Sequence, residues 1–256
     1  MQLIDSHAHI YLDEFSSDLD EMLTRAKKVN VYKILLPNID RETLPDINKL
    51  CSSYPEYLYP MIGLHPTSVK ENFKEELQHL FEDTDFSNYI AIGEIGMDLY
   101  WDKSFIKEQE IAFGHQIELA KTYNLPIVIH TRDAFDEIFT VMDKLNDDHL
   151  KGVFHCFTGG EYEAKKIIEY GNFKLGIGGI VTFKNGGIDK VLKHIDPQHL
   201  VLETDAPYLA PVPYRGKRNE SSYLEIVAEK LCEIYNMSMK EISDITTNNC
   251  KKIFSI

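Results

Sequence analysis

The sequence is short of positive charge. Its 256 residues include 27 lysines and arginines against 41 aspartates and glutamates, which gives a formal net charge of -14. Proteins that bind nucleic acid over a wide surface are usually basic, because their binding energy comes from releasing the counterions of many phosphates. The composition therefore excludes a broad electrostatic footprint on a polyanion, and taken alone it argues against nucleic acid as a partner.

Cysteines and long apolar runs are also scarce. The apolar runs stay far below the ~20 residues that a membrane span needs. The opening residues MQLIDSHAHI contain neither the basic segment nor the apolar segment of a signal peptide. No CxxC spacing occurs among the four cysteines, Cys51, Cys156, Cys232 and Cys250. We therefore expect a cytoplasmic protein with no membrane segment, whose thiols are reduced, buried and inert.

Glycine and proline are too few for a fibrous or low-complexity chain. There are 14 glycines and 10 prolines, and hydrophobic residues make up 43% of the sequence, which is enough for a substantial core. No linker-like shift in composition, charge run or internal repeat divides the chain. The length suits one (β/α)8 barrel, which typically needs roughly 250 residues. We expect a single domain over residues 1–256.

Short β-branched runs alternate with segments of helical period. Eight runs are predicted as strands, and their nearly continuous hydrophobicity is typical of parallel strands covered on both faces: Leu3–His7, Tyr32–Leu36, Leu58–Leu64, Ile90–Glu94, Ile127–His130, Gly152–His155, Lys174–Gly178 and Leu200–Glu203. Capping-box patterns at Ser17-x-x-Asp20 and Ser238-x-x-Glu241 predict helix starts. Single helices between eight strands favour an α/β fold that closes as a TIM barrel, with an additional C-terminal helix, over an open doubly wound sheet.

Polar side chains gather where the predicted strands end. The carboxyl ends of the strands form one rim of a TIM barrel, where such enzymes place their active sites. Six candidate donors are expected on that rim: His7, His9, Glu94, His130, His155 and Asp205. Side chains two apart on a strand, such as those of His7 and His9, point to the same side. Each alone has a structural explanation, but their joint placement predicts a site for zinc, manganese or another divalent ion.

The remaining histidines are less informative. His65 is expected on the same rim as a seventh polar group, either in contact with substrate or as an outer partner of a metal ligand. The others fall in or beside predicted helices or a turn and are interpreted as surface or structural residues: His79, His115, His149, His194 and His199.

With these residues in place, the chain resembles the TatD family of metal-dependent deoxyribonucleases, a branch of the amidohydrolase-like TIM barrels, essentially from end to end. The matching stretches are IDSHAH at 4–9, GLHP at 63–66, IGEIGMD at 92–98, IHTRDA at 129–134, HCFTG at 155–159, ETDAPYL at 203–209 and RGKRNE at 215–220. Ser221 follows the last stretch where the family usually has proline, which is favoured but not required at a helix start.

The resemblance implies two divalent ions, Zn, Mg or Mn. His7, His9 and Asp205 would hold one ion, His130 and His155 the other, and Glu94 would bridge them, whereas related barrels of the phosphotriesterase type bridge with a modified lysine. The expected reaction is hydrolysis of DNA by a metal-activated water, acting from the 3′ end of single strands, with Glu94 and Asp205 as catalytic residues. The expected phosphate contacts are Arg132, Arg215, Lys217 and Arg218.

Other assignments stay open at this point. Glu203 is interpreted as support for the site, and Tyr100 and Trp101 either stack on a base or pack in a loop. The same chemistry on a carbonyl would make an ester or amide hydrolase, for example a D-aminoacyl-tRNA deacylase, so that RNA or aminoacyl-tRNA is an alternative substrate. A metal-binding module without turnover is a third hypothesis, and no obligate protein partner is evident. Two bound ions and the basic loop would make one positively charged patch on an otherwise acidic protein, which suits an exonuclease that acts on strand ends.

Overall fold

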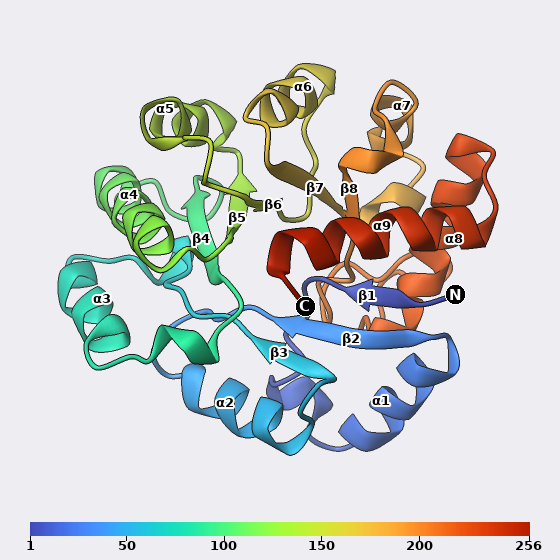
Figure 1. The fold of residues 1–256 in the computed structure, drawn as a ribbon, viewed down its shortest axis with the longest axis horizontal. Helices are drawn as coiled ribbons and strands as arrows, with labels where there is room; N and C mark the ends of the chain where they lie inside the picture. The colour runs from blue at the N-terminus through green and yellow to red at the C-terminus, as the bar shows by residue number, and fades with distance from the viewer.

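Eight parallel strands and their following helices form a ring in the computed structural model, which describes residues 1–256 (Figure 1). The strands are β1 (Leu3–Asp5), β2 (Val31–Leu36), β3 (Leu58–Pro60), β4 (Ile92–Asp98), β5 (Ile127–Arg132), β6 (Gly152–Phe154), β7 (Phe173–Ile177) and β8 (Leu200–Leu202). Neighbouring strands pair in parallel, in the order of the sequence, from β1 to β3 and from β4 to β8. The predicted α/β barrel is confirmed.

Nine α-helices surround the strands. They are α1 (Leu19–Lys28), α2 (Leu44–Ser53), α3 (Phe73–Phe81), α4 (Ile106–Tyr123), α5 (Phe135–Leu145), α6 (Glu161–Glu169), α7 (Ile188–Leu192), α8 (Leu224–Tyr235) and α9 (Met239–Phe254). One helix follows each strand, and α9 is the additional C-terminal helix that the sequence predicts. No helix is both long enough and apolar enough to cross a membrane.

The ring closes through short contacts between two groups of strands. β1 to β3 form one sheet and β4 to β8 the other. Single bridges join them between Ile62 and Ile92 and between Ala8 and Ala206. The amide of Ser6 also donates to the carbonyl oxygen of Leu202 at 3.0 Å. Because both seams are bridged, the carboxyl ends of β1 and β8 are held together although they are far apart in the sequence.

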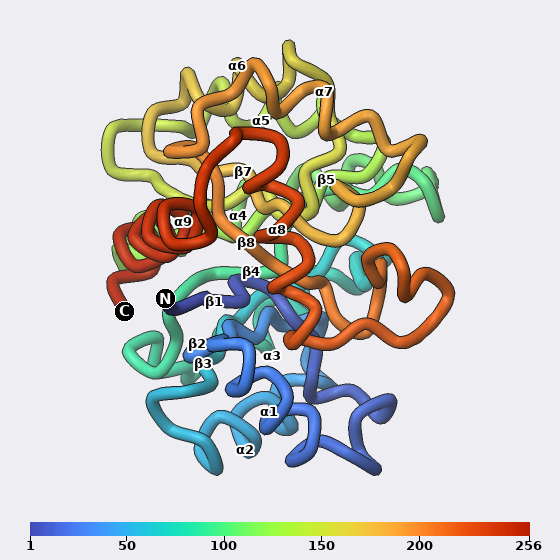
Figure 2. Tube along the Cα trace, turned by 90° about the vertical axis from the view of Figure 1, so that its right-hand side faces the viewer, coloured from blue at the N-terminus to red at the C-terminus, as the bar shows by residue number.

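Helix α9 closes the end of the barrel where the strands begin. Apolar residues of the barrel interior, such as Leu35 and Val201, form one buried cluster with Ile253 and Phe254 of α9. Ser238 accepts from the amide of Glu241 at 3.3 Å and Glu241 accepts from the amide of Ser238 at 2.8 Å, so the predicted capping box is present. Figure 2 shows α9 beside both termini and the segment between β8 and α8 at the opposite end. The end that carries the polar residues is thereby left open.

Several local predictions are wrong. The first and third strands end earlier than predicted, at Asp5 and Pro60. Ser17 does not cap a helix, because α1 begins after Asp18, whose carboxylate binds Arg218 and Arg25 instead of the helix amides. The fourth strand was predicted to end at Glu94, but β4 continues to Asp98 with a shift of register between Ile92 and Ile95. This extension brings one more carboxylate, that of Asp98, to the open end of the barrel.

Candidate metal centre and active site

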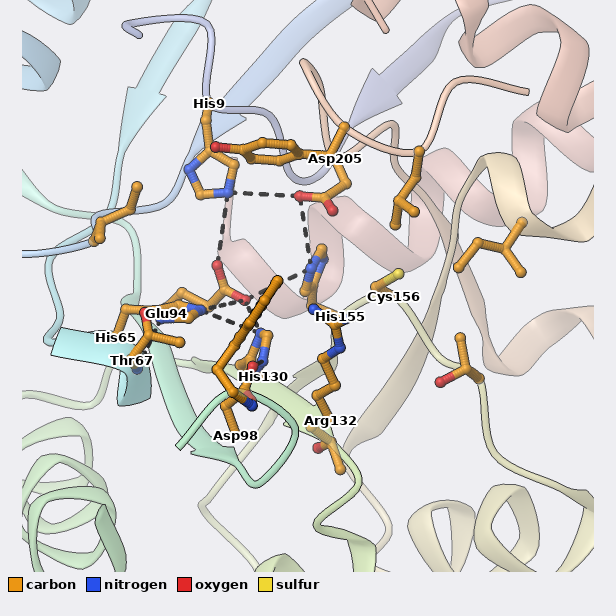
Figure 3. A pocket seen from close by; sticks show the side chains of 17 residues that line it. His9, His65, Thr67, Glu94, Asp98, His130, Arg132, His155, Cys156 and Asp205 are labelled. Atoms are coloured by element: carbon orange, nitrogen blue, oxygen red, sulfur yellow. Dashed lines mark hydrogen bonds and ion pairs between the residues drawn. The ribbon is translucent and has the colours of Figure 1, made fainter. Parts of the chain in front are cut away.

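The strand ends surround a cavity of about 570 Å³. On β5 and β6 the barrel interior is filled by Val128 and Val153. His130 and His155 lie two residues further on and point to the same side, at the mouth of the barrel. The lining of the cavity includes most of the predicted donors, namely His9, Glu94, His130, His155 and Asp205, together with His65 and Arg132. Figure 3 shows these side chains converging from several strands.

A first group of donors consists of His7, His9, Glu94 and Asp205. The Nε2 atoms of His7 and His9 are 3.2 Å apart. Oε2 of Glu94 lies 3.1 Å from Nε2 of His7, and Oδ1 of Asp205 lies 3.5 Å from Nε2 of His9. Donors bound about 2.0–2.1 Å from a tetrahedral ion are roughly 3.3 Å from one another. The spacing of the group therefore fits the edges of a divalent metal site.

The tautomer of His9 fits this role. The hydroxyl of Tyr11 donates to the carbonyl oxygen of Pro37 at 2.9 Å, so its single proton is used. Nδ1 of His9 lies 2.8 Å from the Tyr11 oxygen and must be the donor in that contact. In the neutral ring Nε2 then carries a lone pair, which faces Glu94 and Asp205 with no proton between them. A cation at this position resolves the repulsion, and Tyr11 orients the ligand.

A second group consists of His130, His155 and the other oxygen of Glu94. Nε2 of His130 lies 2.9 Å from Oδ2 of Asp98, and Nδ1 of His155 lies 3.1 Å from Oε1 of Glu203. In the neutral rings, Asp98 accepts the proton on Nε2 of His130, and the nearby Glu203 carboxylate favours the proton of His155 on Nδ1. Nδ1 of His130 and Nε2 of His155 then carry lone pairs. Nδ1 of His130 is 2.8 Å and Nε2 of His155 is 3.6 Å from Oε1 of Glu94. Glu94 thus offers one oxygen to each group.

The buried carboxylates of the site favour the binding of cations. Glu94, Asp98, Glu203 and Asp205 are buried, and histidines are their only ion-pair partners. Burial works against protonation of His155, but the carboxylates of Glu203, Glu94 and Asp205 outweigh it and raise the pKa of His155 to about 10. The imidazole responds to a surplus of buried negative charge. Divalent ions neutralise such a surplus, so the residues present fit a metal centre.

His65 has a different role from the other rim histidines. Nδ1 of its ring accepts from the amide of Thr67 at 3.1 Å. In the neutral ring Nε2 must carry the proton, and it lies 3.3 Å from Nδ1 of His130 and 3.6 Å from Oε1 of Glu94. His65 is therefore a hydrogen-bond donor beside the second group, and its contact with substrate stays a prediction.

The predicted basic loop does not line the cavity. Arg218 donates to both carboxylate oxygens of Asp18, at 2.6 and 2.8 Å, and to the carbonyl oxygen of Glu14 at 2.5 Å. These bonds hold the guanidinium of Arg218 against the start of α1, and a contact of Arg218 with phosphate stays a prediction. Arg215 packs over the ring of Phe183, 4.1 Å from its centroid. For Arg215 and Lys217 a phosphate contact stays a prediction, whereas Arg132 lines the cavity.

Three supporting residues were missed at the sequence level. Asp98 lies in the stretch IGEIGMD, but it follows the predicted strand end at Glu94 by four residues and was therefore not placed at the site. Tyr11 had no signal beyond its place two residues after His9. Cys156 was treated as buried and inert, yet it lines the cavity next to His155. Burial raises the pKa of the Cys156 thiol well above its ordinary value, so the thiol stays protonated.

Comparisons with known proteins show the family of the chain. A family model described as "TatD related DNase" matches residues 4–255. The chain belongs to the TatD family. YabD of Bacillus subtilis, named as a metal-dependent hydrolase, is 40% identical over 255 residues, which cover 99% of both chains. YcfH of Escherichia coli, with the same description, is 30% identical and covers 100% of this chain and 97% of its own.

Solved structures show the same fold. The TatD homologue YjjV of Escherichia coli superposes with a TM-score of 0.90 at 29% identity, covering 99% of this chain and 98% of its own. A TatD-family hydrolase of Entamoeba histolytica, at 24% identity, has a TM-score of 0.85 with the same coverage of both chains. This TatD-family chain is thus a metal-dependent hydrolase built on a TIM barrel.

In this hydrolase the RGKRNE stretch holds the loop that carries Asp205. The side-chain amide of Asn219 donates to the carbonyl oxygens of Thr204 and Tyr208, at 2.6 and 2.7 Å, and these bonds enclose Asp205. Asp205 has a φ of 58°, in the left-handed region, which needs support from its surroundings. Arg218 and Glu220, on either side of Asn219, bind Asp18 and Arg25 at the ends of α1. The stretch anchors the metal-site loop to the barrel.

Replacing Asn219 with alanine should therefore destabilise the protein. The buried carbonyl oxygen of Thr204 and the partly buried one of Tyr208 would lose their donor, and we expect the free energy of unfolding to fall by about 2–4 kcal/mol. Urea unfolding followed by circular dichroism measures the change. Exposed Asn185 provides a matched control, because Asn185→Ala should shift the free energy of unfolding by less than about 0.5 kcal/mol. Equal unfolding midpoints for the two variants would contradict the anchoring role.

Proposed function

We propose that this hydrolase cleaves phosphodiester bonds of DNA, removing nucleotides from the 3′ end of single strands. The observation that carries the proposal is the position of Glu94. Its two carboxylate oxygens each face a separate set of imidazole donors at the bottom of an open cavity. A pair of divalent ions bound in this way activates a water molecule and neutralises charge on a phosphoryl group.

The proposal assigns the donors to two ions. His7, His9 and Asp205 would hold one, His130 and His155 the other, and Glu94 would contact both. Imidazole and carboxylate ligands without thiolate accept Zn, Mn or Mg, so metal content has to be measured. Asp205 would also take the proton of the attacking water. Burial alone raises its pKa, but the neighbouring imidazoles, His155 first among them, outweigh burial and lower the pKa of Asp205, so this carboxylate is ionised.

A phosphate substrate agrees with the lining of the cavity. Arg132 is the only lysine or arginine among the 17 lining residues, and it pairs with no carboxylate. Its guanidinium can bind two oxygens of a phosphate group. A formal net charge of -14 disfavours the wide electrostatic contact that a protein bound along a duplex makes. These features support contact with a few phosphates at the end of a strand.

The deciding experiment compares substrates under identical conditions. Purified, metal-loaded protein is incubated with single-stranded DNA labelled at the 5′ end, with the same DNA labelled at the 3′ end, with its duplex and with a D-aminoacyl-tRNA. We expect the 5′ label to appear in a ladder of shortening strands and the 3′ label to be released first as a mononucleotide. Hydrolysis of the aminoacyl ester with intact DNA would instead identify an ester hydrolase and overturn the proposal.

A further inference from the structure

Two large aromatic side chains lie exposed at the rim of the cavity. Tyr100 and Trp101 lie in the turn after β4, with exposed fractions of 54% and 70%. Trp101 is the only tryptophan of the chain, and it lines the cavity. Large aromatic residues contribute most to stability when they are buried, so an exposed pair beside a candidate active site suggests a surface for binding.

Arg132 packs against this pair. Its guanidinium carbon lies 3.8 Å from the ring centroid of Tyr100 and 5.2 Å from that of Trp101. The two rings meet edge to face, with centroids 5.0 Å apart. Arg132 forms no ion pair, so its N–H groups stay free while the aromatic rings hold the guanidinium in place. A flat apolar face and a free bidentate donor thus lie side by side.

The same pair is tied to the candidate metal site through Asp98. Oδ1 of this buried carboxylate accepts from the amides of Tyr100 and Trp101, at 3.0 and 3.2 Å. Oδ2 lies 2.9 Å from Nε2 of His130. One side chain therefore orients a candidate metal ligand and fixes the turn that presents the aromatic rings. The backbone of the turn is thereby connected to His130 through one buried side chain.

From this arrangement we infer that Tyr100, Trp101 and Arg132 form a subsite for one unpaired nucleotide next to the scissile bond. The base stacks on the face of Trp101, and Arg132 binds the adjoining phosphate. The inference rests on the proposed function, because it concerns a polynucleotide substrate. A base within a duplex has both faces covered by its neighbours, so the subsite selects single-stranded ends. A nucleotide joins a planar base through a sugar to an anionic phosphate, and so matches both the aromatic face of Trp101 and the guanidinium of Arg132.

The single tryptophan makes stacking directly measurable. Metal-loaded protein is titrated with an eight-residue oligothymidylate whose phosphorothioate linkages resist hydrolysis, and fluorescence of Trp101 is recorded. A second oligomer of equal length and charge carries abasic sugars in place of thymidines. We expect saturable quenching by the first oligomer, and at least about 10-fold weaker binding with little quenching by the second. Equal binding and equal quenching by both would overturn the inference.

Variants provide a kinetic test. Trp101→Ala should raise KM for unmodified oligothymidylate about 10-fold with a small change in kcat, while Trp101→Phe, which keeps an aromatic face, should restore most of the loss. Tyr162→Ala removes an aromatic side chain of similar exposure, 68%, that does not line the cavity, and should leave KM unchanged. An unchanged KM in Trp101→Ala would count against the subsite.

The two assays separate this inference from the proposed function. If the protein cleaves single-stranded DNA but its fluorescence does not distinguish thymidine from abasic oligomers, the nuclease stands and the subsite is overturned. If the bases quench Trp101 but no DNA is cleaved, the subsite stands and the nuclease proposal fails. Duplex of the same sequence, in which bases are covered, should quench weakly in either case, and strong quenching by duplex contradicts selection of unpaired ends.

Discussion

Glu94→Ala is expected to abolish metal-dependent hydrolysis, with kcat reduced by at least about 1,000-fold. The variant removes the one carboxylate whose oxygens face both groups of donors, 3.1 Å from His7 and 2.8 Å from His130. Without it, the buried imidazoles retain their lone pairs but lose the negative charge that would hold two ions close together. We therefore expect loss of bound metal as well as loss of turnover.

Two measurements check this prediction together. Elemental analysis of purified protein reports the number of metal ions per chain, and end-labelled single-stranded DNA reports turnover. Glu82→Ala, at an exposed glutamate after α3, controls for the loss of one negative charge and should keep both values. Glu94→Gln keeps the size of the side chain but not its charge, and should also lose metal. Full nuclease activity in Glu94→Ala would show that the assignment of the site is wrong.

Asp205→Asn is expected to have the second largest effect, a fall in kcat of about 100- to 10,000-fold. The amide keeps the shape of the side chain and leaves an oxygen for one ligand contact. It cannot take a proton from water, and it removes one of the carboxylates that surround His155. Because the other five donors stay in place, metal bound by His130 and His155 should be retained, so that turnover falls more than metal content.

Asp205→Asn therefore separates proton transfer from metal binding. Turnover and metal content are measured as for Glu94, and a melting curve confirms that the loop between β8 and α8 still folds. Asp136→Asn, at an exposed position on α5, is the matched control and should leave kcat unchanged. A parallel loss of metal and activity would make Asp205 a ligand alone, and an unchanged kcat would exclude both roles.

The hydrophobic periodicity of the sequence predicts the architecture. The details of the site depend on contacts between residues far apart in the sequence, which this periodicity does not predict. Ser17 and Ser238 carry similar capping patterns, but only Ser238 caps a helix. Asp18 lies beside Ser17 and is bound by Arg218, about 200 residues away in the sequence, so α1 starts differently. Asp98 contacts His130 because β4 continues past Glu94, which the hydrophobic pattern does not indicate.

The sequence by itself determined the barrel and the six candidate donors. Hydrophobic runs of fixed period dictate strands and helices locally, and parallel strands in sequence order bring their carboxyl ends to one rim. The tertiary structure alone shows the ring contacts of His9, His65, His130 and His155, the binding of Arg218 to Asp18, and the stacking of Arg132 on Tyr100 and Trp101. These contacts depend on distances of a few ångströms between atoms remote in the chain. The energies of hydrogen bonds and ion pairs change steeply with such distances, whereas hydrophobic periodicity contains no information about them.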